Sequence, residues 1–389
     1  MKQSAAAGRD AHAPRCVALV ANTAWYLWNF RLNLARELRR RGTDVKLVCP
    51  PDEYVRQLTG EGFEHIEWNL LRRSMEPIGE LRSLAALVRI YRRLRPQSVH
   101  HFTIKCVLYG TLAARLASVP SIVNSITGLG HLIVSDRRLI RLIRPLAIRA
   151  WCNALQAKNS VPVFQNEDDL RLLAGFRPEL ARRAVVTRGS GVDTRRFAPQ
   201  PSARAPQATR TVLFVGRLLR EKGVSELIEA TRLIRARRAD VRFVVCGAID
   251  PGNPSSFTAA DCAAWRREGL IELTGHVDDV EPLYHRADLI VLPSWREGVP
   301  RTLLEAGACA KAVVATDVPG CREVVVPGET GLLVPVRNPA ALAAAIVELL
   351  DDPDRCQSMG MAARERIATH FDEDVIVRDT LNAYGLAKG

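Results

Sequence analysis

Two acidic residues, Glu297 and Glu305, stand eight positions apart in the otherwise small and apolar segment SWREGVPRTLLEAGACAKAVVATDVPG (294–320). The preceding run LIVL (289–292) is typical of a buried strand, and Pro300 suits the first turn of a following helix. Glu297 is then expected at a sheet edge and Glu305 in the second turn of that helix. Each carboxylate can accept hydrogen bonds from vicinal hydroxyls, one pair on a sugar and one on a ribose. The alternative is that both are solvated charges at a helix end.

Two cations, Arg217 and Lys222, lie in the stretch GRLLREKG (216–223), which follows the apolar run TVLFV (211–215). The pattern indicates a strand-to-helix turn with glycines on both sides. Cations and a helix N-terminus both favour a diphosphate at such a turn. A basic turn that is merely solvated surface is the alternative.

Short apolar runs alternate with helical patterns along the whole chain, as in open parallel sheets. In the first half we expect strands at 16–21, 45–49, 98–102, 121–123, 161–165 and 184–187, with a helix at 29–41. In the second half we expect strands at 211–215, 241–246, 271–274, 289–292, 312–315 and 331–334, with helices at 224–237 and 339–350.

These elements predict an α/β protein with two Rossmann-like, doubly wound domains that face a cleft, because ligands in such sheets bind beyond the carboxyl ends of the strands. We expect an N-terminal domain at 1–198 and a linker or loop at 199–210, where PQPSARAPQATR has no periodicity. A C-terminal domain is expected at 211–365. The helical segment 366–389 can return to the first domain.

Three stretches of the second half, GRLLREKG, EGVPRTLLEAGA and ATDVPGCREVVVPGETGLLVP, resemble the nucleotide-sugar-binding half of the retaining GT4 glycosyltransferases, which have the GT-B fold. The segment GSGVD (189–193) is similar to the one that enters the second domain in that family. The resemblance implies that Arg217 and Lys222 neutralise the donor diphosphate, Glu297 contacts the donor hexose, and Glu305 binds the ribose diol. It implies donor-binding positions at Gly216, Arg217, Lys222, Val277, Glu297, Gly298, Val299, Pro300, Arg301 and Glu305.

No metal ion or other cofactor is expected, since fixed cations can stabilise the departing diphosphate. Two short acidic strings, 352–354 and 372–374, have the DxD form of metal-dependent transferases but do not follow a strand. They are interpreted as helix caps.

The first half is expected to hold the acceptor. NTAWYLWNFRLNLAREL (22–38) and VHHFTIKCVLYGTLAARLASVPSIVNSITGLGH (99–131) resemble the family members that add N-acetylhexosamine or hexose to polyprenyl-diphosphate-linked sugars. Many members have a histidine directly before a glycine after the fourth strand, whereas this chain has Thr127. Thr127 and His131 are therefore the catalytic candidates of this half. Acceptor-side candidates are Asn29, Arg31, His100, His101 and Lys105, and at most one of the two adjacent histidines can face the cleft.

Composition and charge limit the partners. The chain has 389 residues, nine cysteines without metal-ligand spacing and a formal net charge of +13. It has neither a signal-peptide pattern nor a membrane-spanning apolar run, so we expect a cytoplasmic protein with reduced thiols. The charge favours an anionic partner.

A basic amphipathic helix is predicted in SDRRLIRLIRPLAIRAWCNAL (135–155). Arginines at 137, 138, 141, 144 and 149 gather on one side, and apolar residues at 139, 142, 143, 146 and 150 on the other. The helix either packs its apolar face on the sheet or attaches to the anionic inner face of the cytoplasmic membrane.

The preferred function is a retaining, metal-independent glycosyltransferase that uses a nucleotide sugar, expected to be UDP-linked, and a polyprenyl-diphosphate-linked acceptor in bacterial surface-polysaccharide or glycoprotein assembly. A sugar-nucleotide epimerase on the same fold is one alternative. A basic anion- or nucleic-acid-binding module with a disused sugar site is the other. The chain has no GxGxxG after either first strand and no nucleic-acid-binding signature, so a dinucleotide cofactor and a nucleic-acid partner are not expected.

Overall fold

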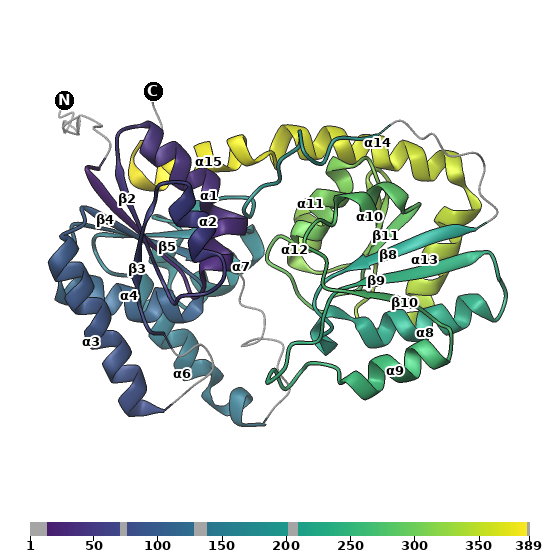
Figure 1. Ribbon diagram of the computed structural model, residues 1–389, viewed down its shortest axis with the longest axis horizontal. Coiled ribbons are helices and arrows are strands. Elements are labelled where there is room, and N and C mark those ends of the chain that lie inside the picture. Colours follow the sequence, from purple (N-terminus) through teal and green to yellow (C-terminus); the bar gives the residue numbers. More distant parts are fainter. Residues whose placement is uncertain (1–13, 71–75, 128–137, 201–208, 387–389) are drawn as a thin grey trace. The chain divides into compact units, whose positions relative to one another are not determined.

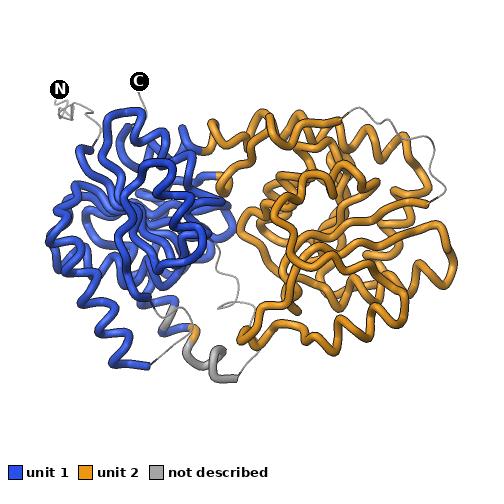
Figure 2. The backbone as a smooth tube through the Cα atoms, in the orientation of Figure 1, with its two compact units in different colours: residues 1–127, 145–187, 377–389 blue, residues 128–144, 188–376 orange. Residues whose placement is uncertain are grey.

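The computed structural model describes residues 14–70, 76–127, 138–200 and 209–386. Its secondary structure forms two parallel sheets, each flanked by helices (Figure 1). Two compact units contain them: unit 1 comprises residues 1–127, 145–187 and 377–389, and unit 2 comprises residues 128–144 and 188–376 (Figure 2). The prediction of two Rossmann-like α/β domains is confirmed.

The sheet of unit 1 has seven parallel strands in the order β3-β2-β1-β4-β5-β6-β7. Its strands are β1 (Cys16–Val20), β2 (Asp44–Cys49), β3 (Glu64–Glu67), β4 (Ser98–Phe102), β5 (Ser121–Ile126), β6 (Ser160–Phe164) and β7 (Val185–Val186). The edge strand β3 was not predicted, because its sequence EHIE carries a single aliphatic residue.

The sheet of unit 2 has six parallel strands in the order β10-β9-β8-β11-β12-β13. These are β8 (Arg210–Val215), β9 (Val241–Cys246), β10 (Glu272–Gly275), β11 (Leu289–Leu292), β12 (Val313–Thr316) and β13 (Gly331–Val334). All six lie within a residue or two of the predicted strands, because buried parallel strands are short continuous apolar runs.

Helices connect the strands in both sheets. The helices before β8 are α1 (Ala24–Arg40), α2 (Val55–Gly60), α3 (Pro77–Leu94), α4 (Ile104–Leu116), α6 (Arg138–Leu155), α7 (Glu167–Ala174) and the 3-10 turn η1 (Pro178–Leu180). They belong to unit 1 except for the first part of α6, residues 138–144, which belongs to unit 2. Unit 2 follows with η2 (Arg220–Lys222), α8 (Val224–Arg235), α9 (Ala259–Arg267), α10 (Glu281–Arg286), α11 (Arg301–Ala308), α12 (Pro319–Val324), α13 (Pro339–Asp351) and α14 (Pro353–His370). The chain ends with α15 (Glu373–Leu381) and η3 (Asn382–Tyr384).

The first helix begins five residues earlier than the predicted 29–41. The Thr23 hydroxyl accepts a hydrogen bond from the Tyr26 amide at 3.1 Å and so caps α1. The aromatic residues that follow belong to the helix, although aromatic side chains have only modest helix propensity.

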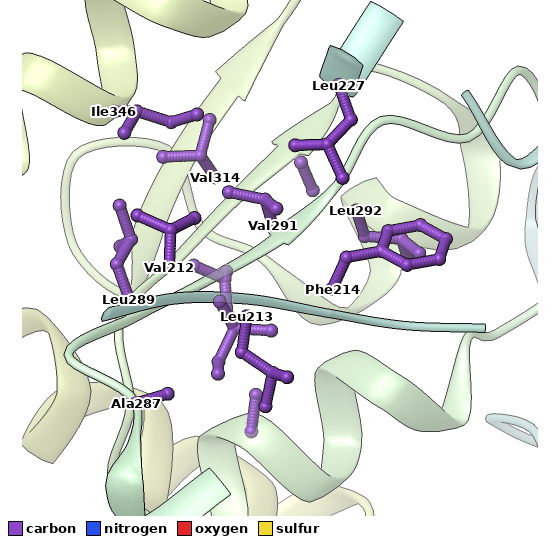
Figure 3. Packing of buried hydrophobic residues seen from close by; sticks show 14 of the residues in the cluster. Val212, Leu213, Phe214, Leu227, Ala287, Leu289, Val291, Leu292, Val314 and Ile346 are labelled. Atoms are coloured by element: carbon purple, nitrogen blue, oxygen red, sulfur yellow. The ribbon is translucent and has the colours of Figure 1, made fainter. Parts of the chain in front are cut away.

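Both faces of each sheet are covered by apolar side chains. In β1, Val17 and Leu19 contribute to one core cluster of unit 1, whereas Ala18 and Val20 contribute to another. In unit 2, Val291 of β11 is in register with Val314 of β12, and both lie near Ile346 of α13 (Figure 3). The buried strands therefore hold their carboxyl ends in fixed positions.

The C-terminal segment returns to unit 1, as the sequence allowed. Leu381 and Leu386 pack in the core that α1 covers, and the Tyr384 hydroxyl lies 2.8 Å from His100 Nδ1 of β4. Unit 1 is therefore built from both ends of the chain.

The helix predicted at 135–155 is present as α6 from Arg138 onward. Its buried side chains include Trp151, Cys152 and Leu155, whereas Leu146 of the predicted apolar side is 71% exposed. The amphipathic projection is therefore wrong at this position, where the helix also contains Pro145. None of the described helices combines the length and apolarity that a membrane span requires.

We predict that Gly223→Ala destabilises the protein by about 2 kcal/mol more than Gly269→Ala. Both glycines have left-handed φ values, +73° and +64°, so each substitution carries the backbone cost of about 1 kcal/mol. A Cβ at position 223 would also lie 2.0 Å from the Pro293 carbonyl oxygen, whereas position 269 has no atom within 4 Å. Urea unfolding of both variants measures the difference, and equal losses would contradict the packing argument.

Candidate functional site

The candidate site lies where the strand order of the second sheet reverses direction. β8 is hydrogen-bonded to β9 on one side and to β11 on the other. The turn after β8 and the loop after β11 consequently share one edge of the sheet. Open α/β sheets bind ligands at this switch point.

Two residues that were expected at the donor, Lys222 and Glu297, meet at this edge. Lys222 Nζ lies 2.5 Å from Glu297 Oε1, with 24% and 10% of the two side chains exposed. The close contact of Gly223 with the Pro293 carbonyl brings the turn of β8 against the loop of β11. The two residues are thus joined by a partly buried ion pair, although 75 positions separate them.

Arg217 lies closer to solvent in the same turn. Its Nη1 donates to Asp250 Oδ2 at 3.0 Å, and 61% of its side chain is exposed. Exposed ion pairs contribute little stability, so this guanidinium can exchange its partner for an arriving anion at small cost.

Glu305 occupies the second turn of α11, as predicted, but is 8% exposed and firmly held. Its Oε2 accepts from the Tyr284 hydroxyl at 2.9 Å and its Oε1 from Arg301 Nε at 2.8 Å. Burial, and then the charge of Glu305, raise the pKa of the Tyr284 phenol well above its usual range. Each carboxylate oxygen retains capacity for a second hydrogen bond.

The segment between Glu297 and Glu305 is approached closely by other parts of the chain at glycines, which have no side chain to prevent the contact. A Cβ on Gly320 would lie 2.0 Å from the Gly298 carbonyl oxygen, and one on Gly189 would lie 2.9 Å from Val299 Cβ. Pro300 immediately precedes α11 as its N-cap. These contacts fix the backbone path that the sequence assigned to donor binding.

Val277 and Gly216 follow β10 and β8, the two strands that flank β9. Val277 follows β10, half-buried against the core of unit 2. Gly216 donates its amide to the Cys246 carbonyl at 2.9 Å at the end of β8. The structure places both on the carboxyl side of the sheet.

A second set of contacts around Trp295 was not predicted. Its indole Nε1 donates to Glu226 Oε1 at 2.9 Å, and its amide donates to the Glu221 carbonyl at 2.9 Å. The Arg337 guanidinium lies 4.0 Å from the centre of its ring. These contacts tie the loop that carries Glu297 to η2, α8 and the segment after β13.

Glu373, at the start of α15, is a titratable residue that sequence reasoning missed. Burial, and then the charge of Asp193, raise the pKa of its carboxyl to about 7, while Arg301 opposes the shift. The approach of Gly191, whose added Cβ would lie 2.6 Å from Glu373 Cα, causes part of this burial. No sequence motif signalled it, because the burial arises from a chain crossing.

The histidines of β4 are structural. His101 Nε2 lies 2.9 Å from the Tyr91 hydroxyl and its Nδ1 lies 2.8 Å from Asn124 Oδ1, while His100 Nε2 lies 2.7 Å from Ser125 Oγ. Both imidazoles are 0% exposed. Burial lowers the pKa of His101 to about 4 and that of His100 well below its usual range. Both histidines were named as acceptor-side candidates, of which at most one could face a cleft; neither ring is open to a ligand, because both are enclosed by internal partners.

The other candidates of unit 1 are spread over three elements. Arg31 is 5% exposed and stacks 4.7 Å from the Phe102 ring, so it belongs to the core beneath α1. Asn29 donates to the Trp25 carbonyl at 2.9 Å, and Lys105 pairs with Glu80 at 2.6 Å. Thr127 follows β5 and is half-buried. His131 lies outside the described residues.

The acidic strings are helix caps, as predicted. Asp352 accepts from the Arg355 amide at 3.0 Å at the start of α14, and Asp372 accepts from the Asp374 amide at 2.9 Å at the start of α15.

A cavity of about 890 Å³ lies at the opposite edge of the second sheet. Arg210, Asp288 and Ala312, at the beginnings of β8, β11 and β12, help to line it. The candidate site residues do not line it, so it is a separate feature of unit 2.

We predict that Trp295→Phe destabilises the protein by about 1–3 kcal/mol, because it leaves the buried Glu226 carboxylate without its indole donor. Trp151→Phe is the matched control: Trp151 is 1% exposed, and its Nε1 has no hydrogen-bond partner among the described residues. Combining Trp295→Phe with Glu226→Leu removes both polar partners and should restore part of the loss. Urea unfolding tests all three, and a control as unstable as Trp295→Phe would argue against the hydrogen bond.

Comparison with known proteins gives two family matches, one in each half of the chain. Residues 16–159 match the family described as glycosyl transferase 4-like, and residues 209–352 match glycosyl transferases group 1. A Campylobacter jejuni N,N'-diacetylbacillosaminyl-diphospho-undecaprenol alpha-1,3-N-acetylgalactosaminyltransferase is 25% identical over 95% of this chain and 98% of its own. An alpha-maltose-1-phosphate synthase from Mycolicibacterium smegmatis is 31% identical over 74% of this chain and 78% of its own.

Among solved structures, the Anabaena protein HepE in complex with UDP superimposes with a TM-score of 0.76. It covers 95% of this chain and 99% of its own at 18% identity, so this likeness shows the fold alone. The predicted GT-B fold is confirmed. With both halves matched, this chain belongs to the glycosyl transferases group 1 family and is a glycosyltransferase.

Proposed function

We propose that this glycosyltransferase moves a hexose or N-acetylhexosamine from a UDP-sugar to a polyprenyl-diphosphate-linked saccharide, with retention of anomeric configuration and without a metal ion. The observation that carries the donor half of this proposal is the Lys222–Glu297 pair at the switch point, with Arg217 in the same turn. Together they supply two cations and one carboxylate at one sheet edge.

The chemistry of transfer fits this arrangement. Cleavage of a glycosyl phosphate bond leaves negative charge on the diphosphate and develops positive charge at the anomeric carbon. Arg217 and Lys222 would stabilise the departing diphosphate, and Glu297 would hold the donor hexose beside it. Because Glu297 already accepts from Lys222, one ion pair sets the positions of both groups.

Glu305 would bind the ribose diol through the hydrogen-bonding capacity that Tyr284 and Arg301 leave open. A buried carboxylate that already accepts two hydrogen bonds is pre-oriented, which lowers the entropy cost of binding the ribose. The nearby backbone from Gly298 to Arg301 would supply amides to the sugar hydroxyls and phosphate. Val277 would lie by the base.

The acceptor proposal is supported by the Campylobacter jejuni relative, whose name specifies a diphospho-undecaprenol sugar and which matches nearly the whole chain. We assign the acceptor to unit 1, with Asn29, Lys105, Thr127 and His131 as candidates. A lipid-linked acceptor further implies peripheral attachment to the inner face of the cytoplasmic membrane, in bacterial surface-polysaccharide or glycoprotein assembly.

The first test is calorimetric titration of UDP, GDP and ADP in EDTA, repeated with Arg217→Ala. We expect UDP to bind selectively, and its affinity to fall by roughly tenfold or more in the variant, because one charge-assisted contact is lost. Arg235→Ala, an exposed arginine at the far end of α8, is the control and should bind UDP like the unaltered protein. Selective binding of GDP or ADP, or no binding, would refute the UDP-sugar proposal.

Substitutions of Glu305 and Glu297 should affect different kinetic constants. Glu305→Gln should weaken UDP affinity and raise KM for the donor, whereas Glu297→Gln should mainly lower kcat. Rates with a UDP-sugar and a polyprenyl-diphosphate saccharide provide the readout. Equal losses of UDP affinity in both variants would contradict this division of roles, and conversion of the donor without any acceptor would indicate an epimerase.

A further inference from the structure

Helices α3 and α4 of unit 1 present an exposed surface with unusual composition. They pack against each other on one side of the first sheet (Figure 1). Four large aliphatic side chains project from them into solvent: Ile78 at 58% exposure, Leu81 at 66%, Leu112 at 44% and Leu116 at 52%. We call this surface, together with its arginines, the α3–α4 face.

Arginines dominate the exposed charge of this face, and the one exposed acid among its described residues is Glu76 at the N-cap of α3. Its arginines are Arg82, Arg89, Arg92 and Arg93 on α3, Arg95 at the C-cap of α3, and Arg115 on α4. The two helices contain one acid, Glu80, which pairs with Lys105 at 2.6 Å. Within the described part of the chain, none of these arginines forms an ion pair.

The arginines and the exposed aliphatic side chains of this face lie among one another and do not form two separate patches. Arg92 donates to the Leu116 carbonyl at 3.3 Å, so the end of α3 lies against the exposed leucines of α4. Some arginines on other helices are neutralised: Arg36 pairs with Glu61 at 2.7 Å, and Arg232 pairs with Glu268 at 2.8 Å. The α3–α4 face therefore combines uncompensated charge with unburied aliphatic surface, as expected for a binding surface.

The chemistry of this face selects its partner. A second copy of the chain would place like charges opposite each other in a two-fold interface. A nucleic acid strand would be expected to stack on exposed aromatic rings, but on these helices Tyr91 is buried and Tyr109 is half-buried. Phospholipid offers anionic phosphates to the arginines and an apolar boundary to the aliphatic side chains.

We propose that the α3–α4 face docks unit 1 on an anionic phospholipid surface, with the four aliphatic side chains entering the headgroup boundary. This docking surface differs from the helix at 135–155, for which the sequence left membrane attachment open as an alternative. The reason for docking rests on the proposed lipid-linked acceptor, whereas vesicle binding itself is measured without any acceptor or donor.

The test is co-sedimentation of the full chain with vesicles of phosphatidylglycerol and phosphatidylcholine, compared with phosphatidylcholine alone. The variant Arg89→Gln/Arg93→Gln/Arg115→Gln should bind anionic vesicles more weakly by on the order of 100-fold. Leu112→Ser/Leu116→Ser should lose roughly tenfold at high salt, where charge attraction is screened. The matched control, Arg235→Gln/Arg237→Gln/Arg267→Gln on exposed positions of unit 2, removes the same charge and should bind like the unaltered protein.

Unchanged vesicle binding of the arginine variant, or an equal loss in the control variant, would overturn the proposal. So would normal binding of the leucine variant together with displacement of the protein from vesicles by duplex RNA, which would assign the face to nucleic acid. UDP calorimetry on every variant verifies the fold of unit 2, and melting curves verify unit 1. If the unaltered protein does not bind UDP, the proposed UDP-sugar donor is refuted. The vesicle experiment still tests whether the α3–α4 face binds anionic phospholipid.

Discussion

The hydrogen bonding of β8 to β11 is the constraint on which the candidate site depends. Leu289 pairs with Val212 and Ile290 with Leu213, so two segments far apart in sequence end at the same sheet edge. In a parallel sheet every strand delivers its following turn to one side, and the switch in strand order leaves a crevice there. Close backbone approaches then determine the distances, because Gly223 leaves no space beside Pro293. The ion pair between Lys222 and Glu297 is the result of this packing.

Around this edge, polar groups are fixed by internal partners to different degrees. Glu305 is buried and accepts hydrogen bonds from Tyr284 and Arg301. The Lys222–Glu297 pair is partly buried, and Arg217 is largely exposed. Under the proposed function the most rigidly held group, Glu305, binds the ribose, and the least rigidly held, Arg217, binds the diphosphate. Rigid groups would orient the parts of the donor that do not react, and the most exposed cation would meet the charge that appears during transfer. Trp295, held by Glu226, supports the middle of this series.

Much of the second unit was predictable, because short stretches of consecutive residues determine its strands and turns. Apolar runs marked the strands, and glycine-bounded turns placed Lys222 and Glu297 at strand ends. Tyr284 and Glu226 were not predictable, since a tyrosine or a glutamate within a helix gives no sign of a partner many residues away. His100 and His101 show the same limit: strand alternation indicated opposite faces, but Tyr384, which lies beside His100, comes from the other end of the chain. Leu146 was misassigned because a helical projection does not tell which side meets the sheet.

The return of the C-terminal segment to unit 1 has a consequence for how the protein is made. Unit 2 comprises no residue after 376, whereas the core of the first unit includes Leu381 and Leu386, with Tyr384 packed against it. On the ribosome the second unit can therefore complete its core first. The earlier-made half must wait while the residues from 188 onward are added, on the order of ten to forty seconds at bacterial elongation rates. During that interval the apolar surface that Leu381 and Leu386 cover in the folded protein lacks those partners.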